Sequence, residues 1–228
     1  MDNKKIYNQG AIIQNKEGVK EYLKNLKYPI YFLDFEAITN GKKWMFDNGL
    51  SLDQQISSFS ILKIEKIDDD ETKVKHFNNV GEREDYPRMA KSLTDFYRDN
   101  GSVVVWGQDL ELRAIAKLLR SSPERLHKKL SKMLSNIIDL QQLFYNNSFI
   151  ELSLSTKTSL GIVAKEYGVY LSGKLSDGKK AHYLLEAAAN SITNKSHLEN
   201  ISRRVQNYNN SDVINIKRIL IEILKQIN

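Results

Sequence analysis

The chain has 228 residues, of which 41% are hydrophobic and 27% are charged, and this composition is typical of a folded globular protein rather than of a disordered one. The absence of cysteine excludes disulfide bonds and thiolate metal sites, and the formal charge of +6 at pH 7 favours acidic partners such as nucleic acid. No stretch approaches the ~18–20 apolar residues of a membrane-spanning helix, and the first ten residues lack the apolar core of a signal peptide, so we expect a cytoplasmic protein.

The N-terminal part predicts a polar lead-in with one helix, followed by a hydrophobic strand. Within residues 1–27, apolar side chains from Val19 to Leu26 recur on one helical face, and Pro29 ends that helix. The segment PIYFLDFE, residues 29–36, then predicts a strand that is apolar on both faces. Such a strand is expected in the centre of a sheet covered by helices.

The middle of the chain alternates between strands and helices. Residues 56–77 predict a hairpin, because hydrophobic residues alternate on both sides of an acidic turn. The next predicted elements, in order, are a helix at 82–98, a buried strand at 101–107, a helix at 108–119, a helix capped by Ser122 with Pro123 at its first position, and a short strand at 136–139 leading into a helix through Phe144.

The remainder is predicted to be mostly helical. A loop at 169–181 interrupts it, and Ser211 is predicted to cap a last helix whose apolar stripe runs to Ile227. Antiparallel strands followed by β–α units predict one mixed sheet with helices packed against it. We therefore expect one α/β domain over residues 28–228, with about five strands of which the first three are antiparallel.

Two acids stand at the end of the first hydrophobic strand. Asp34 and Glu36 are two residues apart, so in a strand their side chains project from the same face. Carboxylates held together in a partly buried setting repel each other, and a divalent cation removes that cost. Hard oxygen ligands of this kind suit Mg²⁺ or Mn²⁺. The alternative is that the strand simply ends and both acids are solvated, as Asp and Glu usually are.

Further acids follow the later predicted strands. Asp109 and Glu111 come after the strand at 101–107, and Asp139 ends the short strand before the next helix. The ends of adjacent strands can present these carboxylates to the first pair. Acids at the start of a helix are also favoured by the helix dipole or by capping alone, so each position has a purely structural explanation as well.

A tyrosine and an acid are paired near the C-terminus. Tyr208 and Asp212 are four residues apart, so they share one face if this segment is helical. The alternative is that Asp212 stabilises the first turn of the last helix and Tyr208 covers a hydrophobic edge.

The order of these residues resembles the DEDD, or DnaQ-like, superfamily of 3′→5′ exonucleases, and within it an uncharacterised bacterial family of exonuclease domains whose first motif reads YFLDFE. The resemblance spans roughly residues 28–225. Its three motifs, YFLDFE, GQDLE and YNNSD, fall on Asp34, Glu36, Glu111, Tyr208 and Asp212. In the second motif Gly107 replaces the usual Asn and Leu110 the usual Phe, which leaves Asp109 as the alternative to Glu111.

This resemblance implies a ribonuclease H-like fold and catalysis by two Mg²⁺ or Mn²⁺ ions, about 4 Å apart, that hold the scissile phosphate. Asp34 would bridge both ions, and Glu36 and Asp212 would complete the ion on the nucleophile side. Glu111 would act on the second ion. Tyr208 marks the tyrosine (DEDDy) type and would position the attacking water. The implied partner is DNA or RNA with a single-stranded 3′ end.

Substrate contacts are predicted on basic and aromatic side chains near the motifs. The candidates are Trp106, Asp109, Lys179, Lys180, Arg203 and Arg204. Basic residues can bind phosphates, and Trp106 can stack on a terminal base. The alternative is that the basic residues form a solvated face and that Trp106 belongs to the core. None of the four histidines has a zinc-ligand spacing.

Two other functions stay open from the sequence. The altered second motif is compatible with a module that keeps the same fold and binds nucleic acid or another partner without catalysis. Paired carboxylates also occur in enzymes such as glycosidases, which would need neither a metal nor the pair of Tyr208 and Asp212. Release of nucleotides from a 3′ end that depends on a divalent metal distinguishes the first function from these two.

Overall fold

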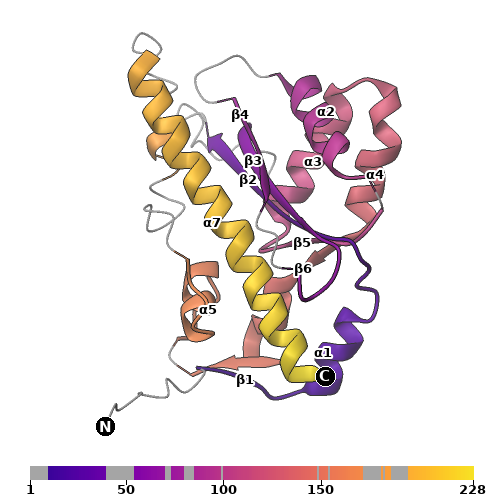
Figure 1. The fold of residues 1–228 in the computed structure, drawn as a ribbon, viewed down its shortest axis with the longest axis vertical. Helices are drawn as coiled ribbons and strands as arrows, with labels where there is room; N and C mark the ends of the chain where they lie inside the picture. Colours follow the sequence, from indigo (N-terminus) through magenta and orange to yellow (C-terminus); the bar gives the residue numbers. More distant parts are fainter. Residues whose placement is uncertain are drawn as a thin grey trace, which may run out of the picture.

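The centre of the protein is a five-stranded mixed sheet with helices on both faces (Figure 1). The computed structural model describes residues 10–39, 54–69, 73–79, 85–98, 100–147, 149–153, 155–171, 181, 183–185 and 195–228. The strands, in their order across the sheet, are β4 (Val74–Asn78), β3 (Gln54–Ile64), β2 (Ile30–Thr39), β5 (Val103–Val105) and β6 (Ile137–Asp139). The strands β2, β3 and β4 are antiparallel neighbours, whereas β5 is parallel to β2 and β6 is parallel to β5. The predicted α/β class and mixed sheet are therefore confirmed.

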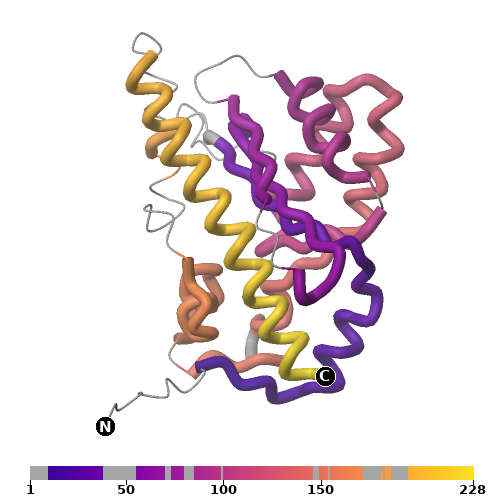
Figure 2. The backbone as a smooth tube through the Cα atoms, viewed as in Figure 1, coloured from indigo at the N-terminus to yellow at the C-terminus, as the bar shows by residue number. Residues whose placement is uncertain are grey.

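The helices form two different layers on this sheet. On one side lie α2 (Tyr86–Phe96), α3 (Asp109–Ser121) and α4 (His127–Ser135), and on the other lies the long helix α7 (Lys195–Ile227). In Figure 2, α7 runs diagonally past the strands, and its C-terminal end lies beside α1 (Lys16–Leu23). Other elements of the described residues are the 3₁₀ helices η1 (Glu124–Leu126) and η2 (Leu140–Asn147), helix α5 (Leu160–Glu166), and a small sheet of β1 (Ala11–Ile13) and β7 (Ile150–Leu152). Among the described helices, none has the length and apolar character to span a membrane.

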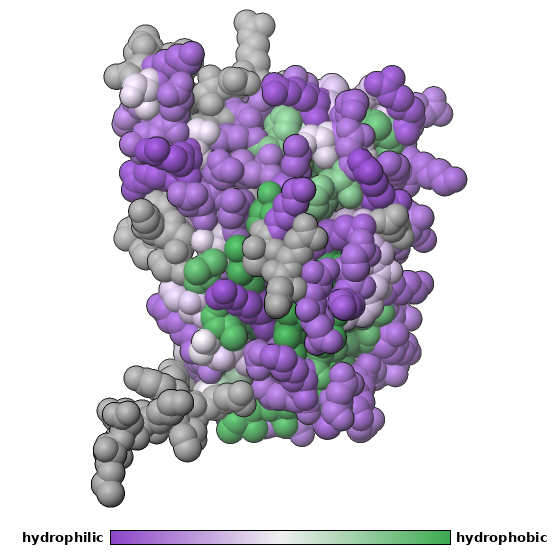
Figure 3. Space-filling model, viewed as in Figure 1, coloured by the Kyte–Doolittle hydropathy of each residue, from purple (hydrophilic) through white to green (hydrophobic). Residues whose placement is uncertain are grey.

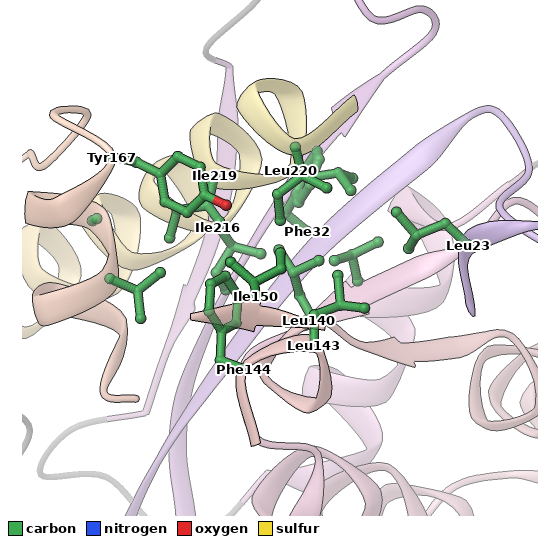
Figure 4. Packing of buried hydrophobic residues seen from close by; sticks show 14 of the residues in the cluster. Leu23, Phe32, Leu140, Leu143, Phe144, Ile150, Tyr167, Ile216, Ile219 and Leu220 are labelled. Atoms are coloured by element: carbon green, nitrogen blue, oxygen red, sulfur yellow. The ribbon is translucent and has the colours of Figure 1, made fainter. Parts of the chain in front are cut away.

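The alternation of side chains along β2 builds both halves of the core. Tyr31, Leu33 and Phe35 pack on the side of α2, α3 and α4, and they are fully buried. Ile30 and Phe32 pack on the other side, in the cluster that includes the apolar stripe of α7 (Figure 4). Burying one such side chain contributes about 1.5–3 kcal/mol to stability. Because successive residues of a strand alternate between faces, the residues that follow Phe32 on the α7 side are Asp34 and Glu36.

The last helix is much longer than the sequence predicted. It begins at Lys195 rather than at Ser211, and the hydroxyl of Ser211 donates a hydrogen bond to the carbonyl of Asn207 within the helix instead of capping it. The segment before Ser211 is rich in Asn, which has a low helix propensity. Burial of Ile201 and Val205 explains why the helix nevertheless continues through it.

Two shorter segments also differ from prediction. Residues 11–13 of the expected polar lead-in form β1, which pairs with β7; strands of three residues leave no periodic pattern to detect. Pro123 has an extended backbone and precedes the 3₁₀ helix η1, so α4 starts only at His127 and is not capped by Ser122.

The surface seen in Figure 3 is mainly hydrophilic. Hydrophobic residues show on this face mostly in its middle and lower part, and hydrophilic residues cover most of the upper part. The N-terminal half of α7, which lies in that upper part in Figure 1, contributes exposed charged residues such as Arg203 and Arg204.

Candidate metal centre

Three carboxylates from distant parts of the sequence meet between β2 and α7. Asp34, Glu36 and Asp212 each offer one carboxylate oxygen, and these oxygens lie within 4.8 Å of one another. Asp34 and Glu36 share the α7 side of β2 because they are two residues apart in the strand. Asp212 is brought to them by α7, which crosses this side of the sheet. Oxygen ligands at this spacing can hold a divalent cation.

The carboxylates lie in an environment that disfavours their charged forms. Burial raises the pKa of Asp34 well above its ordinary value, and the charges of Asp212, Glu36 and Glu111 raise it further. Burial also raises the pKa of Glu36, followed by the charges of Asp212 and Glu111. Oδ2 of Asp34 is buried and accepts no hydrogen bond from any described residue. Without a cation this arrangement is unfavourable, since buried charges need a partner.

Asp212 and Tyr208 act as a pair on α7. The two residues lie one turn apart in the continuous helix α7, and the hydroxyl of Tyr208 donates a hydrogen bond to the carboxylate of Asp212. Burial raises the pKa of Asp212 to about 7, and the bond from Tyr208 lowers it in part. Burial, and then the charges of Asp212, Asp34 and Glu36, raise the pKa of Tyr208 above its ordinary value. Tyr208 is therefore a neutral hydrogen-bond donor at physiological pH.

Glu111 adds a fourth acid at the adjacent strand end. It lies in the first turn of α3 and is only 3% exposed. Burial raises its pKa to about 8, although hydrogen bonds from the backbone of Glu111 itself and of Phe35 on β2 oppose the shift. Its charge raises the pKa values of both Asp34 and Glu36, but it is not one of the three acids within 4.8 Å. Asp109 is exposed, so Glu111 is the acid of the second motif that is buried beside the centre.

The turn that presents Glu111 contains Gly107 and Leu110, the two positions at which the predicted second motif differs from the form usual in the superfamily it resembles. Gly107 has φ +77°, a conformation that glycine adopts without strain, and a Cβ there would lie 2.9 Å from Oε1 of Gln141. Leu110, in place of the usual Phe, still packs at the edge of the core formed with α2, α3 and α4. The departures are therefore compatible with a well-formed turn.

Asp139 supports this same turn and is not a fourth ligand. Its Oδ1 accepts hydrogen bonds from the backbone N–H groups of Gly107 at 2.8 Å and Gln141 at 3.1 Å, and its Oδ2 accepts from the backbone N–H of Gln108 at 3.3 Å and from Nε2 of Gln142 at 3.1 Å. Both oxygens of this buried carboxylate are thus used within the protein. Asp139 therefore has a structural role, which is to hold the turn after β5.

Replacing Asp139 with alanine is expected to destabilise the fold by about 3 kcal/mol, because it leaves several partly buried donors unsatisfied. Urea unfolding measures this change. Replacing the exposed Asp109 with alanine is the control, for which we expect a change below about 1 kcal/mol. Equal effects of the two variants would show that Asp139 does not hold the turn.

The predicted substrate contacts are dispersed. Trp106 is partly buried; its Nε1–H donates to the carbonyl of Thr158 at 3.0 Å, and its ring centroid lies 5.4 Å from that of Phe144, so it packs against the core. Arg203 and Arg204 are exposed on α7, more than one helical turn before Asp212. Lys179 and Lys180 lie outside the described residues.

Sequence reasoning missed the polar residues that surround the acids. Ser58, Ser60 and Asn209 are each fully buried, and His76 and Asn210 are partly buried. For two of them the sequence did hold a usable pattern: Ser58 and Ser60 alternate with hydrophobic residues in β3, which indicates that they share one face of the sheet, and this is the face of Asp34. Asn209 gave no signal, since a buried asparagine in a helix looks like a surface residue in the sequence.

The fold and this site together define an α/β protein with a candidate divalent-metal centre. The chain belongs to the family described as a domain of unknown function (DUF2779), whose model matches residues 31–159. This matched segment contains Asp34, Glu36 and Glu111, and it ends before Tyr208 and Asp212. No significant match to a curated protein or to a solved structure was found.

Proposed function

We propose that the protein is a metal-dependent 3′→5′ exonuclease of the tyrosine-containing DEDD type, which hydrolyses phosphodiester bonds of single-stranded DNA or RNA. The observation that carries the proposal is the meeting of Asp34, Glu36 and Asp212, whose carboxylate oxygens lie within 4.8 Å of one another, across β2 and α7. The motifs that resemble this superfamily supply these three acids, and they also supply Glu111 and Tyr208. The proposed location is the cytoplasm, since a chain without cysteine fits a reducing compartment.

The donor set fits Mg²⁺ or Mn²⁺. All the ligands are carboxylate oxygens, and their charges repel one another. Two of these oxygens, Oδ2 of Asp34 and Oε2 of Glu111, are buried without a hydrogen-bond partner among the described residues. Asp34, Glu36 and Asp212 would hold one ion, and Asp34 with Glu111 a second. When bound, the ions supply Lewis-acid stabilisation of the phosphate and a water of lowered pKa.

The protein's own groups have defined roles in this proposal. The neutral phenol of Tyr208 donates to Asp212, which orients that carboxylate, and in the proposed reaction the same phenol would orient an attacking water. A phenol of raised pKa is a poor general base, so positioning is its role. Arg203 and Arg204, exposed on the same helix, would bind backbone phosphates of a single strand.

The test is a digestion of single-stranded DNA and RNA that carry a label at the 5′ end. In Mg²⁺ or Mn²⁺ we expect a ladder that shortens from the 3′ end and releases mononucleotides. A circular single strand, which has no 3′ end, is the control and is expected to stay intact. Cleavage of the circle, or no product with any divalent cation, would contradict the exonuclease proposal.

A second candidate is a module that binds nucleic acid or metal without catalysis. The observation that favours it is the position of Glu111 outside the set of three acids within 4.8 Å, together with its pKa of about 8, which keeps it largely protonated at neutral pH in the absence of a cation. Binding of Mn²⁺ and of a labelled single strand, with no release of nucleotides, would favour this candidate.

A further inference from the structure

The interface between α7 and the sheet changes from apolar to polar at the acids. On this side β2 presents Phe32 in the apolar core and then Asp34 and Glu36. The strand register continues the polar row across β3 and β4 through Ser58, Ser60, His76 and Asn78. Buried polar groups cost free energy unless they are paired, so polar residues under a long helix need a specific reason.

A chain of hydrogen bonds runs from this row to α7. Nδ1 of His76 lies 2.9 Å from Oγ of Ser60, and Oγ of Ser60 donates to Oδ1 of Asn210 at 2.8 Å. A hydroxyl has one proton, so Ser60 must accept from His76, and this assigns a proton to Nδ1 of the imidazole. A second bond, from Nδ2 of Asn78 to Oγ of Ser202, joins β4 to the same helix.

The hydrogen bond between Ser60 and Asn210 connects a residue next to Asp34 in the sheet with a residue close to Asp212 on α7. Ser60 is the cross-strand partner of Asp34, and Asn210 lies two residues from Asp212 on α7. When Asp34 and Asp212 are both ionised, as binding of a cation requires, they repel each other, and this repulsion favours a shift of α7 relative to β2. A hydrogen bond has a narrow range of distance and angle, and it therefore opposes that shift.

We propose that Ser60 and Asn210 are positioning residues of the metal centre, whose mutual hydrogen bond, supported by His76, holds Asp212 opposite Asp34. The inference rests on the proposed function, because it assumes that the acids bind a divalent cation. Apart from Asn210, which stands within the third motif, the residues involved lie outside the three motifs. The inference also explains why polar residues are buried between α7 and the sheet.

The test measures the affinity of the full chain for Mn²⁺ by isothermal titration calorimetry in Ser60→Ala, Asn210→Ala and the double variant. Each single variant is expected to bind Mn²⁺ about tenfold more weakly, the lower end of the loss seen when residues that orient metal ligands are removed. The double variant is expected to bind no more weakly than either single one, because both remove the same bond. On a labelled single strand, kcat should fall while KM stays within about twofold.

The matched control is Ser211→Ala. This residue is also buried and lies beside Asp212, but its hydroxyl bonds to the carbonyl of Asn207 inside α7, so the variant removes a serine hydroxyl without touching the sheet. We expect unchanged affinity for Mn²⁺. Circular dichroism at the temperature of the titration shows that each variant is folded, and if Ser60→Ala is not, Asn210→Ala carries the test, because Asn210 is only partly buried.

The outcomes separate this inference from the proposed function. If the unmodified chain binds Mn²⁺ and the Ser60 and Asn210 variants bind it equally well, the positioning role is overturned and the exonuclease proposal stands. Additive losses in the double variant, or an equal loss in Ser211→Ala, would also overturn it. If the unmodified chain binds no Mn²⁺, both proposals fail.

Discussion

Replacing Asp34 with asparagine is expected to abolish the proposed nuclease activity, with a loss of at least about 10³-fold, while it stabilises the metal-free protein. The loss follows because bound metal ions supply several kcal/mol of transition-state stabilisation and Asp34 is the acid that would touch both ions. The gain in stability, about 1–3 kcal/mol, follows because asparagine removes a charge that Asp212 and Glu36 repel, and because its amide can donate to a neighbouring carboxylate, whereas Oδ2 of Asp34 is buried without a hydrogen-bond partner among the described residues.

This prediction needs the turnover rate and the free energy of urea unfolding on the same samples. The matched control is Asp95→Asn, which changes an exposed carboxylate on α2 whose ion pair with Lys91 is at the surface; we expect little change in either quantity. A variant of Asp34 that loses stability and activity together would indicate a structural role for this acid instead of a place in a metal site.

The stability of the metal-free protein is expected to fall as the pH rises from 6.5 to 8. Burial raises the pKa of Asp212 to about 7 and that of Glu111 to about 8, whereas in the unfolded chain both groups ionise near pH 4. Between pH 4 and pH 8 the folded chain therefore binds more protons than the unfolded chain, and stability decreases with pH. From the two groups together we expect a decrease of about 2 kcal/mol between pH 6.5 and pH 8.

The window starts at pH 6.5 because His76 has the opposite effect at lower pH. Burial lowers the pKa of His76 to about 4, so between pH 4 and 6.5 the unfolded chain binds the extra proton and stability rises with pH. Urea unfolding at pH 6.5 and pH 8 avoids most of this contribution, since the unfolded imidazole, half protonated at pH 6.5, leaves only about 0.4 kcal/mol of opposite sign. Saturating Mn²⁺ is expected to remove the decrease, since a bound cation favours the ionised carboxylates, and Asp212→Asn is expected to reduce it. Metal-free stability that rises over this window would show that the acids are solvated.

The architecture was largely predictable because the strands of the sheet carry clear patterns. The run from Ile30 to Phe35 is hydrophobic on both faces apart from Asp34, as a central strand must be when helices cover both sides of the sheet. The length of α7 was not predictable, since packing of Ile201 and Val205 outweighs the weak helix propensity around them. The short strands β1 and β7 depend on each other for pairing, which no local pattern reveals.

The acids of the candidate site could be proposed from their spacing in the sequence, but the burial of their side chains could not be predicted. A spacing of two in a strand and of four in a helix places Asp34 with Glu36 and Tyr208 with Asp212 without knowledge of the fold. The choice between Glu111 and Asp109 depends on the turn after β5, and only the three-dimensional arrangement shows which of them is buried.

The polar residues beneath α7 were beyond sequence reasoning for a related reason. Ser60 and Asn210 are ordinary small polar residues, separated by 150 positions, and their bond exists only because α7 crosses the sheet above β3. Their proposed role therefore follows from the arrangement of α7 on the sheet.

Anomalous diffraction from a crystal soaked in Mn²⁺ tests directly whether the acids between β2 and α7 bind two metal ions. A two-metal centre predicts two manganese peaks about 4 Å apart, one within coordination distance of Asp34, Glu36 and Asp212 and the other between Asp34 and Glu111. A single peak that leaves Glu111 unbound would support the non-catalytic candidate. A crystal in which no manganese lies against Asp34 would contradict the proposed metal centre.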